Sequence, residues 1–405
     1  MRWDAQRLDA GGLFDGAPGG TVGTADTALP LPIRGAVERT FPTPEFRGVT
    51  FYEIRAKSVL NRVSEASRVP FRWTVNPYRG CTHACTYCFA RKTHTYLDLD
   101  AGLDFDSRIV VKTNAPEVLR RELTSPRWQR EHVAMGTNVD CYQRAEGRYA
   151  LMPGIIGALR DTGTPFSVLT KGTLVLRDLP LLRGAATEAG FSANVSVGSL
   201  DRTLWRTVEA GTPSPQARLR VCSTLTDAGI RCGVLMAPVL PHLTDSEEAI
   251  DATIAAIAAA GATHVTGIAL HLRPGAREWF LSWLAREHPA LVGPYRRLYG
   301  RGAYAPEAYR RELSARIAAA TRRHGLDRRD GVGQSDGVGQ RDGVDRRHGL
   351  DRRDGVDQSD GVDQSDGADR SDGADRRDAA RGRWLEPARA QVETAPEPPA
   401  QLSLL

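Results

Sequence analysis

The sequence lacks the features that mark membrane and secreted proteins. No run of about eighteen apolar residues occurs in the 405-residue chain, so no transmembrane helix is expected. The N-terminal segment carries Asp4 and Asp9 and contains no continuous apolar stretch, so we do not expect a secretory signal. These absences predict a cytoplasmic protein, in which thiols stay reduced.

Cysteine is scarce, with six residues in the chain. Three of them, Cys81, Cys85 and Cys88, are spaced C-x₃-C-x₂-C in the segment NPYRGCTHACTYCFARKTH. In a reducing compartment this cluster indicates metal binding or catalysis rather than disulfides. A zinc site would need a fourth ligand, such as His83 or His94, whereas three thiolates fit a [4Fe–4S] cluster that keeps one iron without a protein ligand.

Strong charge of one sign is also missing from the chain as a whole. The formal net charge is +5 and the isoelectric point about 9.0, which is compatible with a polyanionic partner without proving one. Residues 324–377 are nine tandem hexapeptides of the type DGVDQS, and their charges sum to −4, which leaves +9 on the remainder. Each hexapeptide contributes one small apolar side chain, so we predict that this segment is disordered.

Between about residues 71 and 272, short β-rich runs alternate with helical stretches. Most runs are continuously apolar, as expected of parallel strands that are buried on both faces. The runs are residues 71–77, 108–114, 132–140, 165–172, 191–199, 231–239 and 264–272. Repeated β-α units of this kind predict an α/β fold with a full or partial (β/α) barrel.

Two of the intervening helices carry clear terminal signals. Ser214 is a candidate N-cap followed by Pro215, and Gly229 is the expected end of that helix. A second helix is expected to begin at Asp245 as N-cap and to end at Gly261.

The composition divides the chain into five predicted segments. An irregular arm over residues 1–45 precedes a barrel over 46–272 and a helical extension over 273–323. The disordered repeats over 324–377 and a flexible tail over 378–405 follow.

The cysteine spacing, with the aromatic Tyr87 before the last cysteine, resembles the signature of the radical S-adenosylmethionine (SAM) superfamily. The motifs MGTNVDCYQRAEGRY, SVLTKG, EAGTPSPQARL, MAPVLPHLTDSE and LHLRPGAREWF extend the likeness over about residues 45–320. Together they are similar to an uncharacterised actinobacterial group related to spore photoproduct lyase. The resemblance implies a partial barrel of the radical SAM type, a [4Fe–4S] cluster and cleavage of SAM to a 5′-deoxyadenosyl radical.

The resemblance also implies roles for residues that follow predicted strands, where the functional groups of a barrel gather. It assigns the cluster to Cys81, Cys85 and Cys88, the adenine to Tyr87, the amino group of SAM to Gly136, Thr137 and Asp140, its carboxylate to Lys171, and its ribose to Ser196 and Ser199. Lys171 is equally interpreted as a solvated lysine at a strand end, and the two serines as hydroxyls that satisfy the backbone.

Several neighbouring residues keep two interpretations. Tyr142, Gln143 and Glu146 either face a substrate or cap the next helix, and Arg273 binds an anionic group or pairs with an acid. The segment EAGTP departs from the related group, which leaves the role of Glu209 in doubt.

The other three cysteines have no assigned function. Cys141 also departs from the related group and is interpreted as a chance substitution. Cys222 and Cys232 are expected to be small core residues.

The substrate and the partners are less well defined by the residues. Arginines and aromatics interleave over residues 277–313, which favours DNA repair or nucleic-acid modification, although helices that cover the barrel would share this pattern. Gln401, Leu402 and Leu404 in the terminal QLSLL resemble a pentapeptide that docks on the DNA sliding clamp. We also expect an electron donor such as ferredoxin or flavodoxin. The alternative is a non-catalytic iron–sulfur or zinc protein that docks on DNA or on the clamp.

Overall fold

The computed structural model describes residues 35–65, 67 and 69–327. All of these residues belong to one of the two units into which the chain divides, residues 1–341 with 401–405. Most of the predicted arm, nearly all of the hexapeptide repeats, the predicted tail and its Gln401, Leu402 and Leu404 lie outside the described residues. No helix in the described part of the chain is long and apolar enough to cross a membrane.

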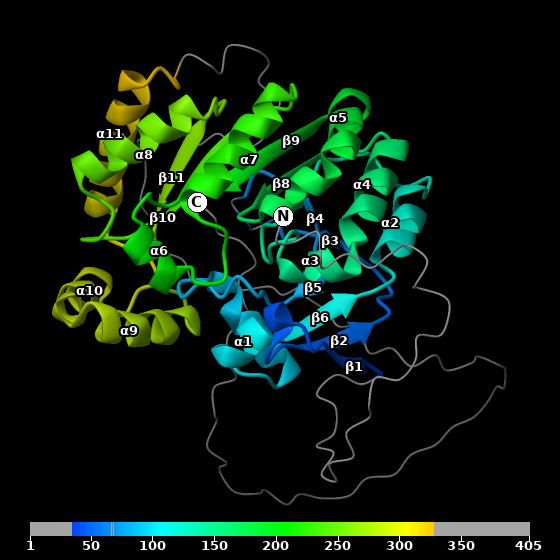
Figure 1. The fold of residues 1–405 in the computed structure, drawn as a ribbon, viewed down its shortest axis with the longest axis horizontal. Coiled ribbons are helices and arrows are strands. Elements are labelled where there is room, and N and C mark those ends of the chain that lie inside the picture. Colours follow the sequence, from blue (N-terminus) through cyan, green and yellow to red (C-terminus); the bar gives the residue numbers. More distant parts are fainter. Residues whose placement is uncertain (1–34, 66, 68, 328–405) are drawn as a thin grey trace, which may run out of the picture. The chain divides into compact units, whose positions relative to one another are not determined.

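The main sheet has seven strands, and its inner strands are parallel, as predicted (Figure 1). Its order is β11 (Val265–Ala269), β10 (Cys232–Val239), β9 (Phe191–Ser196), β8 (Phe166–Thr170), β7 (Val133–Met135), β4 (Trp73–Val75) and β3 (Leu60–Arg62). Only β3 runs antiparallel to its neighbour. Strands β3 and β11 are the two edges of this sheet, which makes it an open, partial barrel and confirms the predicted fold class.

A second sheet of four strands corrects two expectations. It has the order β1 (Val37–Thr40), β2 (Thr50–Ile54), β6 (Arg108–Lys112) and β5 (Tyr78–Arg79). The run at residues 108–114 therefore does not enter the barrel; β6 pairs in parallel with β2 instead. A buried apolar run fits the interior of either sheet, so its composition could not identify the partner. Strand β1 also lies within the segment that we predicted to be irregular.

Helices connect successive strands from β5 to β11. They are α1 (Leu103–Ser107), α2 (Ala115–Leu123), α3 (Arg144–Tyr149), α4 (Leu151–Asp161), α5 (Leu179–Glu188), α6 (Arg202–Val208), α7 (Pro215–Asp227) and α8 (Glu247–Ala259). Ser214 caps α7 as expected, because its hydroxyl accepts from the Ala217 N–H at 3.2 Å. The predicted cap of α8 was wrong by one residue: Ser246, rather than Asp245, accepts from the Ala249 N–H at 3.1 Å.

Three further helices follow β11, as predicted for this region. They are α9 (Ala276–Glu287), α10 (Val292–Tyr299) and α11 (Glu307–Arg323). Helix α11 packs on α8 and β11, and in Figure 1 α9 and α10 lie at one end of the sheet. A hydrophobic cluster that includes Phe280, Trp283 and Tyr295 also contains Cys85 and Tyr87. The C-terminal helices thus support the loop that carries the three cysteines.

Candidate active site

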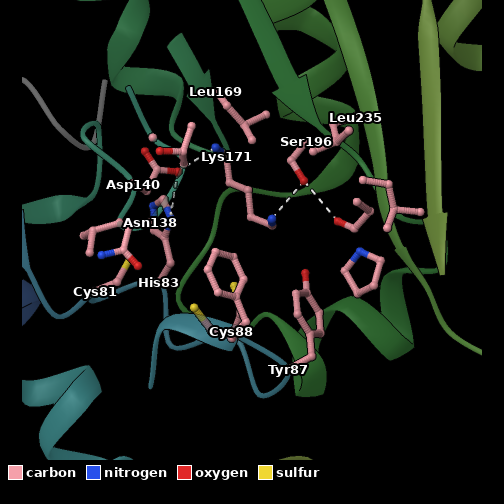
Figure 2. Close-up of a pocket in the computed structure, with 18 of the residues that line it drawn as sticks. Cys81, His83, Tyr87, Cys88, Asn138, Asp140, Leu169, Lys171, Ser196 and Leu235 are labelled. Carbon is pink, nitrogen blue, oxygen red and sulfur yellow. Dashed lines mark hydrogen bonds and ion pairs between the residues drawn. The ribbon is translucent and has the colours of Figure 1, made fainter. Parts of the chain in front are cut away.

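A single cavity collects most of the residues that the sequence singled out (Figure 2). It opens at the carboxyl ends of β7 to β11, and the cysteine loop closes its other side. Its empty space is about 910 Å³ with its open mouth included. The predicted residues in its wall are Cys81, Cys85, Tyr87, Cys88, Gly136, Thr137, Asp140, Lys171 and Ser196.

The cysteine loop folds through two backbone turns with positive φ. Gly80 has φ +83°, and a Cβ there would lie 2.8 Å from the His94 ring, so only glycine fits. Ala84 adopts φ 53° between the first two cysteines. Both turns aim the thiols of Cys81 and Cys85 toward the cavity, which they line.

Arg91 anchors the backbone of this loop. Its guanidinium is fully buried and donates to the Cys85 carbonyl oxygen at 2.9 and 3.1 Å. The same group forms two hydrogen bonds of 2.9 Å with Asp106. Both contacts to Asp106 come from Nη2, and this ion pair together with the two bonds to Cys85 positions the loop between Cys85 and Cys88.

The three thiols are suited to a bound cation. Burial raises the pKa of Cys81, of Cys88 and of Cys85, the last to about 12, so that all three are protonated without one. Iron would displace these protons, as thiolate ligation requires. Among the described residues, no group of three His, Cys, Asp or Glu side chains could hold a single metal ion.

The segment after β7 has two features of a ligand site. Gly136 has φ +78°, and a Cβ there would lie 1.8 Å from the Leu169 carbonyl oxygen, so β8 can pass only against a glycine. The Thr137 hydroxyl is buried and has no hydrogen-bond partner in the described structure, although it lies in the cavity wall. An unsatisfied buried hydroxyl costs about 1–3 kcal/mol, which a bound ligand would recover.

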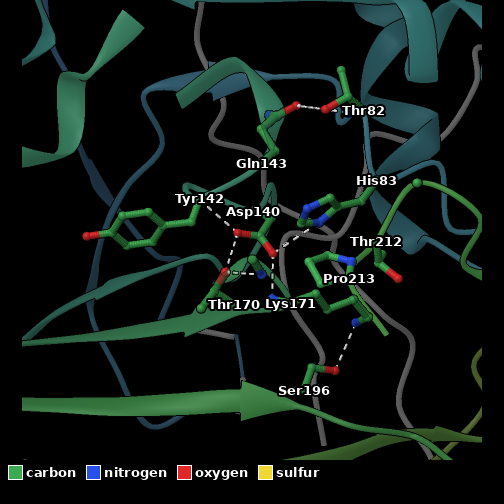
Figure 3. A network of polar contacts seen from close by, with 12 residues as sticks. Thr82, His83, Asp140, Tyr142, Gln143, Thr170, Lys171, Ser196, Thr212 and Pro213 are labelled. Carbon is green, nitrogen blue, oxygen red and sulfur yellow. Dashed lines mark hydrogen bonds and ion pairs between the residues drawn. The ribbon is translucent and has the colours of Figure 1, made fainter. Parts of the chain in front are cut away.

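Asp140 is the centre of a polar network at the edge of the cavity (Figure 3). Its carboxylate accepts from the backbone N–H groups of Tyr142 and Lys171 at 2.9 and 2.7 Å and from the Thr170 hydroxyl at 2.7 Å. It also pairs with His83 at 3.2 Å. The carboxylate is therefore already occupied by the chain, so it orients the strand ends around the site rather than offering a free acceptor.

Burial acts to raise the pKa of Asp140, but the charge and hydrogen bond of His83 and the bonds from Lys171 and Thr170 lower it to about 2. This is below the unfolded value near 3.9, so the carboxylate stabilises the fold above pH 4 and loses that effect as the pH falls through 2. We expect Asp140→Asn to lower the free energy of unfolding in urea by about 2–3 kcal/mol at pH 7. The difference in free energy of unfolding between the variant and the parent should narrow below pH 4. A difference that does not change with pH would contradict a stabilising, charged Asp140.

Lys171 and Ser196 come together across the cavity. The Lys171 ammonium donates to the Ser196 hydroxyl at 2.8 Å and lies 5.8 Å from the centre of the Tyr87 ring. Ser196 also donates to the Ala237 carbonyl oxygen at 3.2 Å. The two residues therefore lie where a small ligand would contact both, whereas Ser199 is not in the wall; its hydroxyl accepts from the Asp201 N–H at 3.1 Å.

Gln143 and Glu146 lie behind the cavity rather than in its wall. Gln143 accepts from the Thr82 N–H and donates to the Gly80 carbonyl oxygen, both at 2.9 Å, and so braces the cysteine loop. Glu146 accepts from the backbone of Leu151 and Met152 at 3.0 Å each, which is the capping role at the start of α4. Neither residue is among those that line the cavity.

The sequence analysis did not assign His83, Asn138 or His271 to the SAM site. Tyr142, which the sequence left as a possible substrate contact, does not line the cavity. Its hydroxyl donates to Asp178 at 3.0 Å. His83, Asn138 and His271 do line the cavity. His83 lies between two cysteines and was considered only for zinc, and His271 lies beside Arg273 in LHLRPG, the last predicted strand.

The remaining cysteines are buried and do not line the cavity. Cys141 is 1% exposed, and Cys222 and Cys232 are fully buried in the main core between α7 and β10. The last two thus behave as the small core residues that we expected.

Comparison with known proteins identifies the family of the chain. A model described as the radical SAM superfamily matches residues 75–254. An uncharacterised protein of Mycobacterium tuberculosis (strain H37Rv) is 53% identical over 326 residues, which are 80% of this chain and 93% of that protein. An uncharacterised protein of Methanocaldococcus jannaschii is 28% identical over 207 residues, 51% of this chain and 73% of the other.

Solved structures with the same fold include spore photoproduct lyase complexed with dinucleoside spore photoproduct, at a TM-score of 0.52 and 15% identity over 68% of this chain and 79% of that one. A mutant of that enzyme with bound AdoMet and dinucleoside spore photoproduct also gives 0.52 and 15%, over 67% and 78%. At this identity the likeness concerns the fold alone. With the extended match to the mycobacterial relative and the family model over the barrel, the chain belongs to the radical SAM superfamily.

Proposed function

We propose that this protein is a radical SAM enzyme that acts on a nucleic acid. The observation that carries the first part is the shared cavity: three cysteines on one wall face Thr137, Lys171 and other polar strand ends on the opposite wall. Each wall comes from a different part of the sequence, and only the folded barrel unites them.

The residues present fit both cofactors. Cys81, Cys85 and Cys88 would hold a [4Fe–4S] cluster, and the unpartnered Thr137 hydroxyl, Lys171 and Ser196 would hold SAM. When bound, the reduced cluster supplies the electron that cleaves SAM and yields a 5′-deoxyadenosyl radical. Apolar side chains from both walls, such as Phe89, Leu235 and Leu270, line much of the rest of the cavity and limit the water that can contact its polar groups.

The charge at the mouth of the cavity supports a polyanionic substrate. Arg273 donates to the Tyr304 hydroxyl at 2.9 Å and lies 5.9 Å from the centre of the Phe89 ring. The His271 ring makes an edge-to-face contact with the Tyr304 ring, with ring centres 4.6 Å apart. Burial, aided by the charges of Arg273 and Arg310, lowers the pKa of His271 to about 4, so its ring is neutral at pH 7. A cation beside flat rings is the pattern that takes a phosphate and a stacked base.

The test of the enzyme is anaerobic reconstitution with iron and sulfide, followed by dithionite and SAM. The proposal expects about four irons per chain and formation of 5′-deoxyadenosine. A colourless protein with one zinc per chain and no SAM cleavage would instead favour the non-catalytic alternative. Comparing the rate with dimer-containing DNA, tRNA and undamaged DNA would then identify the substrate class.

Arg273→Gln tests the substrate class separately. If Arg273 contacts phosphate, this variant should bind a fluorescent single-stranded oligonucleotide about tenfold more weakly at 50 mM salt, with a shallower salt dependence. Arg127→Gln is the control, because Arg127 is exposed and precedes β7 at the opposite ends of the strands. Equal losses in the two variants would indicate non-specific charge rather than a site.

The partners remain part of the proposal. We place the reaction in the cytoplasm with a ferredoxin- or flavodoxin-type electron donor, because a reducing compartment keeps the buried thiols available for iron. Docking on the sliding clamp through Gln401, Leu402 and Leu404 is tested by Leu402→Ala with Leu404→Ala, which should abolish clamp binding without changing SAM cleavage.

A further inference from the structure

The last residue of α6 and the four residues after it pack against the cysteine loop. The Thr86 N–H donates to the Val208 carbonyl oxygen at 3.0 Å, and the Gly211 N–H donates to the His83 carbonyl oxygen at 3.1 Å. A Cβ on Gly211 would lie 2.3 Å from the Thr82 carbonyl oxygen. Only glycine at this position therefore allows the two backbones to approach so closely. The cysteine loop and residues 208–212 therefore form one backbone unit.

A buried ion pair also connects residues 208–212 to the tyrosine of the cysteine loop. The Tyr87 hydroxyl donates to one oxygen of Glu209, and the Arg218 guanidinium donates to the other. Glu209 is 6% exposed and Arg218 is 1% exposed. Burial acts to raise the pKa of Glu209, but the charges of Arg218 and Lys171 lower it, so the carboxylate is charged.

The same guanidinium also reaches the far wall of the cavity. Arg218 donates from Nη1 to the Ser196 carbonyl oxygen at 2.8 Å, at the end of β9. It further donates to the Pro213 carbonyl oxygen at 2.9 Å and to the Thr212 hydroxyl at 3.0 Å. One side chain of α7 thus binds the end of β9, residues 209–213 and, through Glu209, the cysteine loop.

These contacts set the distance between two groups that face each other. Tyr87 belongs to the cysteine loop, whereas Ser196 and Lys171 belong to strand ends on the other wall. Figure 2 shows Lys171 directed toward Ser196, with Tyr87 rising from the loop into the same space. Stability alone is a poor reason for this arrangement, because replacing a buried ion pair by apolar side chains is often neutral or stabilising.

We propose that Glu209 and Arg218 are positioning residues for SAM, which hold the Tyr87 ring and the Ser196–Lys171 pair at a fixed separation across the cavity. The inference rests on the proposed function, since SAM must be the occupant. It assigns to the segment EAGTP, whose role the sequence left in doubt, the task of coupling the cysteine loop to the SAM site. Neither residue is among those that line the cavity, so both act through Tyr87 and Ser196.

The first test is a double-mutant cycle with Tyr87→Phe and Glu209→Gln in the reconstituted full-length protein. We measure iron per chain, the melting temperature and the dissociation constant of SAM by anaerobic equilibrium dialysis. Tyr87→Phe keeps the ring but removes its tether, so SAM should bind about tenfold more weakly while iron content stays at the parental value. Glu209→Gln should weaken binding similarly, and the combined variant should lose little more than either single one.

A charge-free pair separates positioning from stability. Glu209→Gln with Arg218→Met removes both charges together, so no charge is left buried and unpaired. The matched control is Glu146→Gln with Arg177→Met and Asp178→Asn, because Arg177 pairs with both buried acids, at N···O distances of 2.6 and 2.7 Å, outside the cavity. The inference expects weaker SAM binding only in the first pair, with KM for SAM raised more than kcat is lowered.

Each outcome decides the inference. Parental SAM affinity in Tyr87→Phe, or in a folded Glu209→Gln, Arg218→Met protein with full iron content, would overturn it and leave the enzyme proposal intact. Equal losses of SAM affinity in the two charge-free variants would also overturn it, because burial alone would then explain the effect. A parent protein that takes up no cluster and binds no SAM would overturn the proposed function and this inference together.

Discussion

Replacing any one of Cys81, Cys85 and Cys88 by alanine is expected to abolish iron uptake and SAM cleavage. A tight loop supplies all three thiolates, and each is expected to hold one iron of the cluster, so no single one can be spared. Iron should fall from about four per chain to below one, and 5′-deoxyadenosine formation to below about 1% of the parent. Iron and sulfide analysis of anaerobically reconstituted protein measures the first, and chromatography of the nucleoside measures the second.

Cys222→Ala is the matched control for these variants. Cys222 is fully buried, but it packs between α7 and β10, away from the cavity. Its replacement removes one sulfur atom from the core, which should lower stability by about 1 kcal/mol without changing iron content. Cysteine-loop variants that retain full iron and sulfide would contradict the assignment of the cluster.

Gly136→Ala is expected to produce the second-largest effect. The new methyl group would overlap the Leu169 carbonyl oxygen at 1.8 Å, and the backbone there has φ +78°, which alanine adopts only with strain. Because the obstacle is backbone, β7 and β8 must separate at the wall that carries Thr137 and Asp140. We expect a loss of about 4 kcal/mol or more in the free energy of unfolding.

Gly163→Ala isolates the backbone part of that loss. Gly163 has φ +60°, but a Cβ there would have no atom within 4 Å. Its replacement should lower the free energy of unfolding by only about 1–2 kcal/mol and leave SAM binding unchanged. If the Gly136 and Gly163 variants lose equal stability, the close approach of β8 does not shape the site.

The parts of the site that the sequence could reveal are those with a local pattern. Cys81, Cys85 and Cys88 are near neighbours in sequence, and their spacing needs no knowledge of the fold. Lys171 follows strand β8 and Ser196 ends strand β9, and parallel strands deliver their carboxyl ends to one edge of the sheet. Local chemistry plus one rule of topology was therefore enough to bring these residues together.

The parts that could not be predicted depend on long-range contacts. The run that became β6 reads as a barrel strand, and only its pairing with β2 and β5 places it in the second sheet. Asp140 was expected to bind SAM, because the sequence cannot show that the chain itself occupies both its oxygens. Arg218 is one of many helical arginines in the sequence, and nothing local marks it as the contact of Glu209 and Ser196.

The most direct test of the account is an electron paramagnetic resonance spectrum of the reduced, reconstituted protein, recorded before and after SAM is added. If three cysteines hold the cluster and SAM enters the adjoining cavity, the account expects a [4Fe–4S]⁺ signal whose g values change on addition of SAM. Addition of S-adenosyl-L-homocysteine instead of SAM tests the role of the sulfonium. If binding needs the sulfonium, the g values should not change with this compound. A strong cluster signal that stays identical with saturating SAM would contradict the central claim, because the cluster would then be closed to the cofactor.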